Sequence, residues 1–138
     1  MLVIFFVALG GALGTLCRYL LSTFFDHWVI YLVGQYPLPF GIIMCNLTGC
    51  FMIGMTGGYF VKDHVIDHFS TPYFRAFLVT GFLGGYTTFS SFNLEALKLV
   101  QTGHEMLVAG YITVTIVMCI LSAFVGFELV ERKMLLRG

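Results

Sequence analysis

The chain has 138 residues, of which 59% are hydrophobic and 10% are charged, and its formal net charge at pH 7 is zero. About a quarter of the residues of a soluble domain are charged, so this composition excludes an ordinary soluble protein, and the lack of a basic cluster argues against nucleic acid as a partner. The mean hydropathy of +0.94 predicts an all-α membrane protein, and the length predicts one transmembrane domain over residues 1–138.

Four apolar segments are long enough to cross a bilayer, which takes about 20 helical residues. They cover residues 2–25, 39–61, 72–101 and 105–130, and the connections between them, at 26–38, 62–71 and 102–104, are short. Four crossings predict that both ends of the chain lie on the same side of the membrane.

Glycines recur four residues apart in the first two segments, at Gly10 and Gly14 and at Gly54 and Gly58. This spacing lets two membrane helices approach backbone to backbone. The sequence leaves open whether these close contacts fall within one subunit or between two subunits.

Two polar side chains lie within the same apolar segments. Arg18, beyond the middle of the first segment, either extends to the lipid headgroups or provides a fixed positive charge at a pore mouth that attracts anions. Asn46, deep in the second segment, needs a partner because an unpaired amide is costly in hydrocarbon. It either joins two helices or lines a polar path.

The third segment contains the stretch 81–92, GFLGGYTTFSSF, with three glycines and four Ser or Thr hydroxyls. Glycine loosens a helical backbone, and Ser and Thr bond to nearby backbone groups. We therefore expect the third helix to open near Gly84 and Gly85, with a break over 84–87 that falls near mid-membrane between two half-helices. Opened backbone at that depth is tolerated where it lines a polar cavity, and broken helices often place backbone dipoles against ions.

The residues after this break suit an ion path. Phe89 and Phe92 share one face of the second half-helix, and Thr88, Ser91 and Glu95 share the neighbouring face. Ring edges are positive and hydroxyls donate hydrogen bonds, so these faces suit an anion, although two phenylalanines at this spacing also suit core packing. Glu95 either pairs with a lysine one turn later or titrates on an ion pathway.

Tyr111, Thr115 and Cys119 recur every four residues on one face of the fourth segment. They form either a polar seam between helices or a wet track beside the phenylalanines. The other three cysteines also lie in apolar segments without CxxC spacing, which favours packing roles over a disulfide or a metal site.

The chain resembles the CrcB, or Fluc, family of fluoride channels. The matching residues are Gly10-Gly11 to Gly14 followed by Arg18-Tyr19, Asn46 followed by Gly49, and above all the stretch 81–92. The number, length and order of the segments match as well, so the resemblance covers nearly the whole chain.

The resemblance implies a homodimer whose two subunits insert in opposite orientations into a bacterial-type plasma membrane, with two fluoride pathways. It implies a structural sodium ion at the dimer centre, held by the backbone carbonyls of Gly84 and Thr87 of each subunit. It also implies the side chains of the fluoride pathway, which are Asn46, Phe89, Ser90, Ser91, Phe92, Glu95, Tyr111, Thr115 and Cys119. The thiol of Cys119 departs from a common pattern of the family, in which a stronger donor, a hydroxyl, is found.

Fluoride enters cells as neutral HF and is trapped as the anion, so a passive channel would let the membrane potential expel it and lower its toxicity. The sequence has no ATP motif, and it has no nucleophile–base pair or metal cluster that would predict an enzyme. Two alternatives differ in kind. A small proton-coupled multidrug transporter also has four helices but needs a membrane-centred carboxylate, and a non-transporting assembly subunit would use the stretch 81–92 for packing alone.

Positive charges bear on the orientation of the chain. If both termini lie on one side, five Lys and Arg residues fall there and two fall on the other side: Lys62, Arg75, Arg132, Lys133 and Arg137 against Arg18 and Lys98. The positive-inside rule then predicts that both termini are cytoplasmic, whereas dual topology predicts an even balance. The family resemblance favours dual topology.

Overall fold

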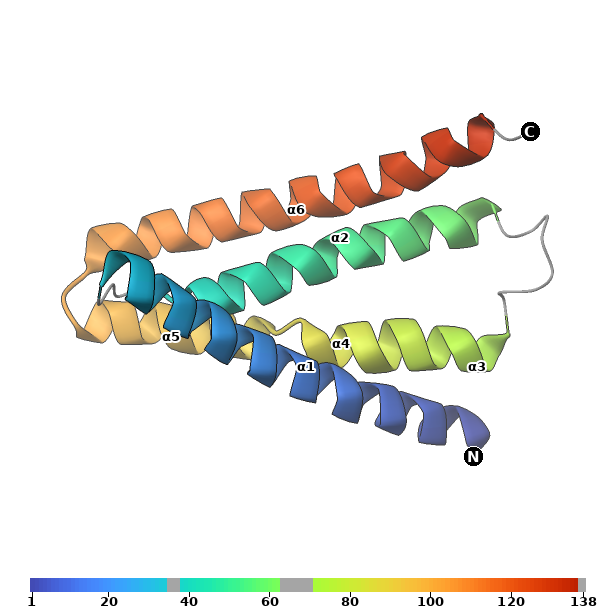
Figure 1. Ribbon diagram of the computed structural model, residues 1–138, viewed down its shortest axis with the longest axis horizontal. Helices are drawn as coiled ribbons and strands as arrows, with labels where there is room; N and C mark the ends of the chain where they lie inside the picture. Colours follow the sequence, from blue (N-terminus) through green and yellow to red (C-terminus); the bar gives the residue numbers. More distant parts are fainter. Residues whose placement is uncertain (35–37, 63–70, 137–138) are drawn as a thin grey trace.

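The computed structural model describes residues 1–34, 38–62 and 71–136. Parts of the predicted connections 26–38 and 62–71, namely residues 35–37 and 63–70, lie outside the described residues, as does Arg137 of the charge count. All regular elements of the described ranges are helices: α1 (Leu2–Val33), α2 (Phe40–Lys62), α3 (Pro72–Arg75), η1 (Ala76–Leu83), α4 (Gly84–Tyr86), α5 (Phe89–Gln101) and α6 (Glu105–Leu135) (Figure 1). The start of α1 and the end of α6 lie at the same end of the bundle.

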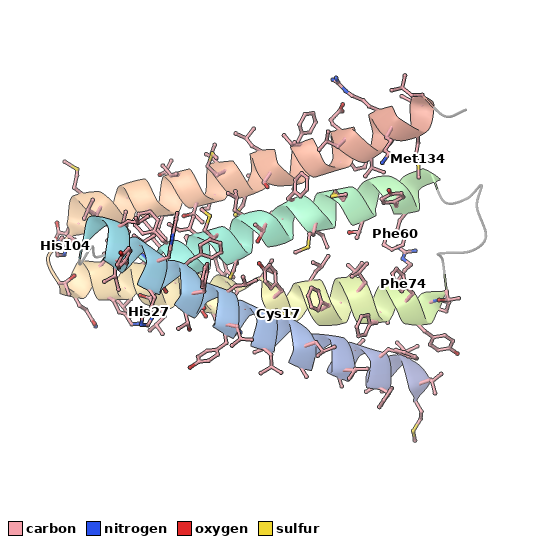
Figure 2. The ribbon with its side chains drawn as sticks, viewed as in Figure 1. Cys17, His27, Phe60, Phe74, His104 and Met134 are labelled. Carbon is pink, nitrogen blue, oxygen red and sulfur yellow. The ribbon has the colours of Figure 1, made fainter. Side chains whose placement is uncertain are left out.

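Helices α1, α2 and α6 are each long and apolar enough to span a membrane, which confirms an all-helical membrane protein. Large apolar side chains cover their outer surfaces, among them Phe5 and Phe24 on α1 and Phe124 on α6, and Figure 2 shows side chains projecting outward along both helices. Exposing so much apolar surface to water would be unfavourable, whereas the hydrocarbon core of a bilayer accommodates it.

Helix α1 continues past the predicted end at residue 25, and α6 continues past residue 130. The added turns of α1 carry Asp26, whose Oδ1 accepts a hydrogen bond of 2.8 Å from the Gly41 N–H in the first turn of α2. A carboxylate at a helix N-terminus satisfies a free amide and offsets the helix dipole. The polar residue that suggested a loop is therefore a cap for the next helix.

The third predicted segment is divided. Residues 72–86 form α3, η1 and α4 without a gap, and α5 begins at Phe89. Between them, Thr87 (φ −81°, ψ 153°) and Thr88 (φ −150°, ψ 118°) have extended backbones. Gly84 and Gly85 are themselves helical, so the chain leaves the helix at Thr87, which is the last residue of the expected break over 84–87 and lies after the glycine pair. The π-helical geometry of η1 was not predicted. π-Helices are rare overall, and those that occur are often found at functional sites.

The glycines serve close packing instead. A Cβ atom on Gly85 would lie 2.6 Å from the carbonyl oxygen of Gly11, and one on Gly10 would collide with the backbone of Phe77 and Phe82. Helix α1 thus lies directly against η1 and α4. In the same way, Gly54 leaves room for the backbone of α6. The close glycine contacts therefore fall within one subunit.

Candidate functional site

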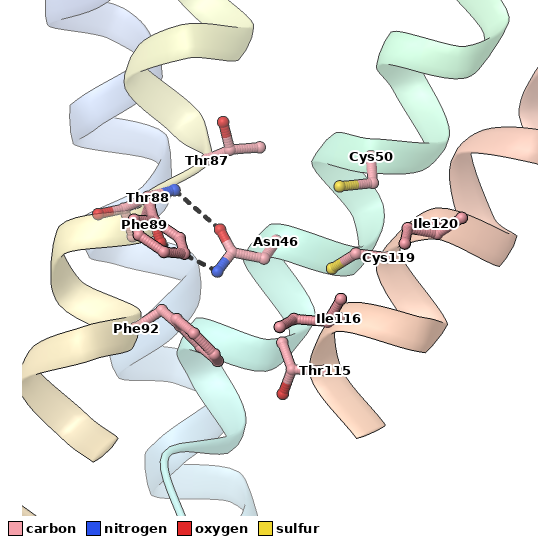
Figure 3. A pocket seen from close by; sticks show the side chains of 10 residues that line it. All are labelled: Asn46, Cys50, Thr87, Thr88, Phe89, Phe92, Thr115, Ile116, Cys119 and Ile120. Atoms are coloured by element: carbon pink, nitrogen blue, oxygen red, sulfur yellow. Dashed lines mark hydrogen bonds between the residues drawn. The ribbon is translucent and has the colours of Figure 1, made fainter. Parts of the chain in front are cut away.

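Asn46 of α2 holds the interruption between α4 and α5. Its side chain is 7% exposed, its Oδ1 accepts from the Thr88 N–H at 2.8 Å, and its Nδ2 donates to the Thr88 carbonyl at 3.1 Å (Figure 3). In an unbroken helix the Thr88 N–H would bond to the Gly84 carbonyl. One buried amide thus replaces the helical partners of Thr88 and stabilises the extended backbone.

Thr88 also caps α5. Its Oγ1 accepts from the Ser91 N–H at 3.1 Å, donates to the Ser91 hydroxyl at 3.1 Å, and lies 3.1 Å from the hydroxyl of Ser90. Threonine is a preferred N-cap because it satisfies an amide that has no partner within the helix. The hydroxyls of Ser90 and Ser91 are therefore engaged at the start of α5. The sequence signal for this cap was a Thr three residues before Ser91, ahead of an amphipathic segment.

Arg18 bridges the two sides of the interruption. Its Nε donates to the Gly85 carbonyl at 3.1 Å, and its Nη1 donates to the Ser91 hydroxyl at 3.3 Å. A cation beside the last carbonyls of a helix is favourable. These bonds direct the guanidinium across the bundle and not toward the headgroups.

An open pocket of about 290 Å³ lies directly beside the interruption. Its walls come from α2, from the first turn of α5 with the two residues before it, and from α6; the lining residues are Asn46, Cys50, Thr87, Thr88, Phe89, Phe92, Thr115, Ile116, Cys119 and Ile120 (Figure 3). The structure therefore brings together five of the side chains assigned to the predicted pathway: Asn46, Phe89, Phe92, Thr115 and Cys119.

Thr115 lines this pocket and carries a hydroxyl that has no hydrogen-bond partner among the described residues. The residue is 4% exposed, and its Oγ1 is buried with no hydrogen-bond partner among the described residues. Buried polar atoms almost always have partners, because an unpaired one costs about 1–3 kcal/mol. An unpaired buried hydroxyl on a residue that lines the pocket is therefore the feature of this site that most directly indicates a ligand.

The two phenylalanines differ in burial. Phe89 is 73% exposed and Phe92 is 4% exposed, and their ring centroids are 5.7 Å apart. Tyr111 packs against Phe92 with centroids 5.0 Å apart, and its hydroxyl donates a long bond of 3.5 Å to the Phe92 carbonyl. Tyr111 belongs to the small core beneath α5 and does not line the pocket.

Glu95 also lies outside this pocket. Its Oε1 is 2.7 Å from Lys98 Nζ, which confirms the ion pair considered from the sequence, and both side chains are partly exposed. Cys50, in contrast, lines the pocket but was not assigned to the site. Its position one turn after Asn46, on the same face of α2, was the available signal.

The model of a protein family described as CrcB-like protein, Camphor Resistance (CrcB), matches residues 5–127. The chain belongs to the CrcB family. Relatives named fluoride-specific ion channel FluC include one from Francisella philomiragia, 35% identical over 126 residues, which are 91% of this chain and 92% of the relative. Another, from Methylobacillus flagellatus, is 40% identical over 128 residues, 93% of this chain and 94% of the relative.

A third relative of the same name, from Rhizobium meliloti, is 37% identical over 129 residues, 93% of this chain and 95% of the relative. The resemblance noted from the stretch 81–92 is confirmed. As a CrcB protein whose described residues include three helices long and apolar enough to span a membrane, the chain is an integral membrane protein of the bacterial plasma membrane.

Proposed function

We infer that this chain is a fluoride channel and not an enzyme. The family match and the relatives named fluoride-specific ion channel support this function. The structural observation that carries it is the buried hydroxyl of Thr115, which has no partner among the described residues and belongs to a residue that lines a pocket walled by Phe89 and Phe92. A hydroxyl donor beside ring edges suits a small anion.

The pocket matches what fluoride requires. Fluoride is small and strongly hydrated, so a selective path has to replace its water with several donors at once. Thr115 offers a hydroxyl, and the amide of Asn46 has a second N–H beyond the one that bonds to Thr88. Cys119 offers a weaker thiol donor on the same wall.

The remaining assigned residues act around the pocket. Arg18 contributes positive charge beside the first turn of α5, where Ser90 and Ser91 fix the helix start. Tyr111 packs against the ring of Phe92 and supports it. Glu95 lies one turn of α5 after Phe92, toward the outer end of the proposed path.

Transport is passive. Fluoride accumulates in the cell as the anion of HF, and the membrane potential expels a negative charge through an open path. Channel activity of this kind lowers fluoride toxicity without ATP. We propose that the interruption at Thr87 and Thr88 lies near mid-membrane, which is supported by the lengths of its two sides: residues 72–86 and 89–101 are each shorter than the about 20 residues of one crossing, and together they are long enough to cross.

The functional unit is a homodimer of two chains inserted in opposite orientations. The exposed ring of Phe89 and the open side of the pocket support it, because a second subunit would cover both. The family resemblance adds two fluoride pathways per dimer.

A sodium ion at the centre of this dimer fits the backbone at the interruption. Since the Thr88 N–H is donated to Asn46, the Gly84 carbonyl loses its usual helical partner, and the extended backbone at Thr87 directs another carbonyl out of the helix. Carbonyl oxygens suit a hard cation. The backbone carbonyls of Gly84 and Thr87 of both subunits would hold the ion. Its role would be structural, because it would join the two chains.

Fluoride efflux from proteoliposomes, read with a fluoride electrode and repeated with chloride, tests the proposed function. We expect rapid fluoride efflux and none of chloride above the protein-free background. Equal rates for both anions, or no fluoride efflux, would contradict the proposal. Proton-coupled uptake of a lipophilic cation in the same vesicles would favour the transporter alternative.

A further inference from the structure

Helices α2 and α6 lie side by side and run in the same direction (Figure 1). Glycines set their register: a Cβ on Gly58 would lie 3.0 Å from the Phe127 carbonyl oxygen, and one turn earlier a Cβ on Gly54 would lie 2.8 Å from the Ala123 carbonyl carbon. Residues on one helix face recur about every four positions. The pairs Gly58–Phe127 and Gly54–Ala123 are therefore followed, one turn earlier in both helices, by Cys50 opposite Cys119.

The two thiols meet in the pocket. Both residues line the pocket wall, and both sulfurs are drawn on that wall in Figure 3. Both cysteines are free and partly accessible. The following turn of the row carries Asn46 and Thr115, so the thiol pair lies directly beside the polar groups of the site.

We propose that Cys50 and Cys119 form a two-thiolate binding site for a soft divalent cation, with Hg²⁺ as the ion it fits best, and that the bound ion blocks the pocket. Two S–H bonds break, two Hg–S bonds form, and two protons pass to water, without oxidation or reduction. Hg²⁺ is satisfied by two thiolates in a linear arrangement. The product is neutral, which suits an apolar pocket in which an isolated charge would be costly.

The number of ligands distinguishes this site from a zinc site. Structural zinc takes four ligands. Across residues 1–34, 38–62 and 71–136 no group of three or more His, Cys, Asp or Glu side chains is placed to hold a metal. Two facing thiols therefore suit an ion that needs two ligands, and soft thiolates select soft metals.

Retention of mercury by the purified full-length chain tests the binding site. The reduced protein is loaded with HgCl₂ and then challenged with excess monothiol. An ion held by two thiols of one chain resists exchange, because the second bond is intramolecular. We expect one Hg per chain in the wild type and about tenfold less in Cys50→Ala and Cys119→Ala. X-ray absorption of the loaded wild type should show two sulfur ligands.

Cys17→Ala is the matched control, because Cys17 lies on α1 and does not line the pocket. It should retain mercury like the wild type. Equal retention by folded Cys50→Ala, or no retention by the wild type, would overturn the site. Cys50→Ser, which keeps the size of the side chain, replaces the alanine variant if that variant elutes as aggregate.

The block rests on the proposed function and has its own readout. The fluoride efflux rate with HgCl₂ is divided by the rate without it, separately for each variant. We expect a ratio near zero for the wild type and for Cys17→Ala, and a ratio near one for Cys50→Ala. Mercury retained by a wild type whose fluoride efflux is undiminished would overturn the block and leave the metal site standing.

Discussion

The two sides of the interruption at Thr87 and Thr88 are fixed by different means. Before it, η1 and α4 lie against α1 backbone to backbone, in spaces that only glycine leaves open. After it, polar side chains, chiefly Asn46 and Arg18, fix the start of α5, and a small apolar core that includes Phe92 and Tyr111 packs beneath the helix. The first side therefore depends on shape, whereas the position of the first turn on the second side depends on a few named hydrogen bonds. Substitutions in the first should unfold the protein, whereas those in the second should change transport with a smaller loss of stability.

The largest effect is expected for Gly10→Ala. Its Cβ would overlap the Phe77 carbonyl oxygen and lie 2.8 Å from the Phe82 nitrogen, and backbone atoms cannot move aside as a flexible side chain would. We expect a loss of about 3 kcal/mol or more, seen as aggregation on size exclusion in detergent. Gly11→Ala is the control, since its Cβ would meet only the Gly81 oxygen at 3.9 Å. Similar behaviour of the two variants would contradict backbone-to-backbone packing.

Asn46→Ala should give the next largest effect. It leaves the Thr88 N–H and carbonyl without their side-chain partner, at a cost of about 2 kcal/mol, and α5 loses its fixed start. We expect a lower melting temperature and loss of fluoride efflux. Asn46→Asp keeps an acceptor for the Thr88 N–H but places a negative charge in the pocket. A melting temperature closer to that of the wild type, with efflux still lost, would separate the two roles of this residue.

Phe92→Ile and Phe89→Ile should both lower fluoride efflux strongly while the protein stays folded. Their stabilities should differ, because Phe92 is buried against Tyr111 and Phe89 is largely exposed. We expect a cost of about 1–2 kcal/mol for Phe92→Ile and under about 0.5 kcal/mol for Phe89→Ile. Thermal unfolding in detergent and electrode-recorded efflux measure the two effects. Undiminished efflux in both variants would remove the rings from the mechanism.

Lys98→Gln should have the smallest effect. The ion pair with Glu95 is partly exposed, and such pairs contribute about 0.2–1 kcal/mol, reduced further by salt. We expect little change in melting temperature at 0.15 M salt, and a fluoride efflux close to that of the wild type. A large loss of efflux would contradict this expectation and would show that the ion pair between Lys98 and Glu95 is needed for transport.

Much of the site followed from local patterns. Asn46 and the phenylalanines are identifiable because a deep amide and a glycine- and hydroxyl-rich stretch are unusual in apolar segments. Their meeting in one pocket with Thr115 depends on how α2, α5 and α6 pack, which spacing within one helix does not give.

The exact place of the interruption could not be predicted for the same reason. Glycine suggested Gly84 and Gly85, but an amide from α2, 42 residues away in sequence, fixes Thr88 in an extended conformation. The glycines are used for contact with α1 instead. Likewise, Asp26 looked like a loop residue because its partner, the Gly41 amide, belongs to the next helix.

Fluoride efflux through Thr115→Val is the most direct test of anion binding, because the unpaired hydroxyl of Thr115 is the donor proposed for fluoride. Valine has nearly the same shape, and Oγ1 of Thr115 has no hydrogen-bond partner among the described residues, so the substitution should not lower the melting temperature. If the hydroxyl is a donor to the anion, fluoride efflux should fall at least about tenfold, since one hydrogen bond to a charged group contributes about 1.5–3 kcal/mol. Efflux equal to that of the wild type, from a variant of equal stability, would contradict the account.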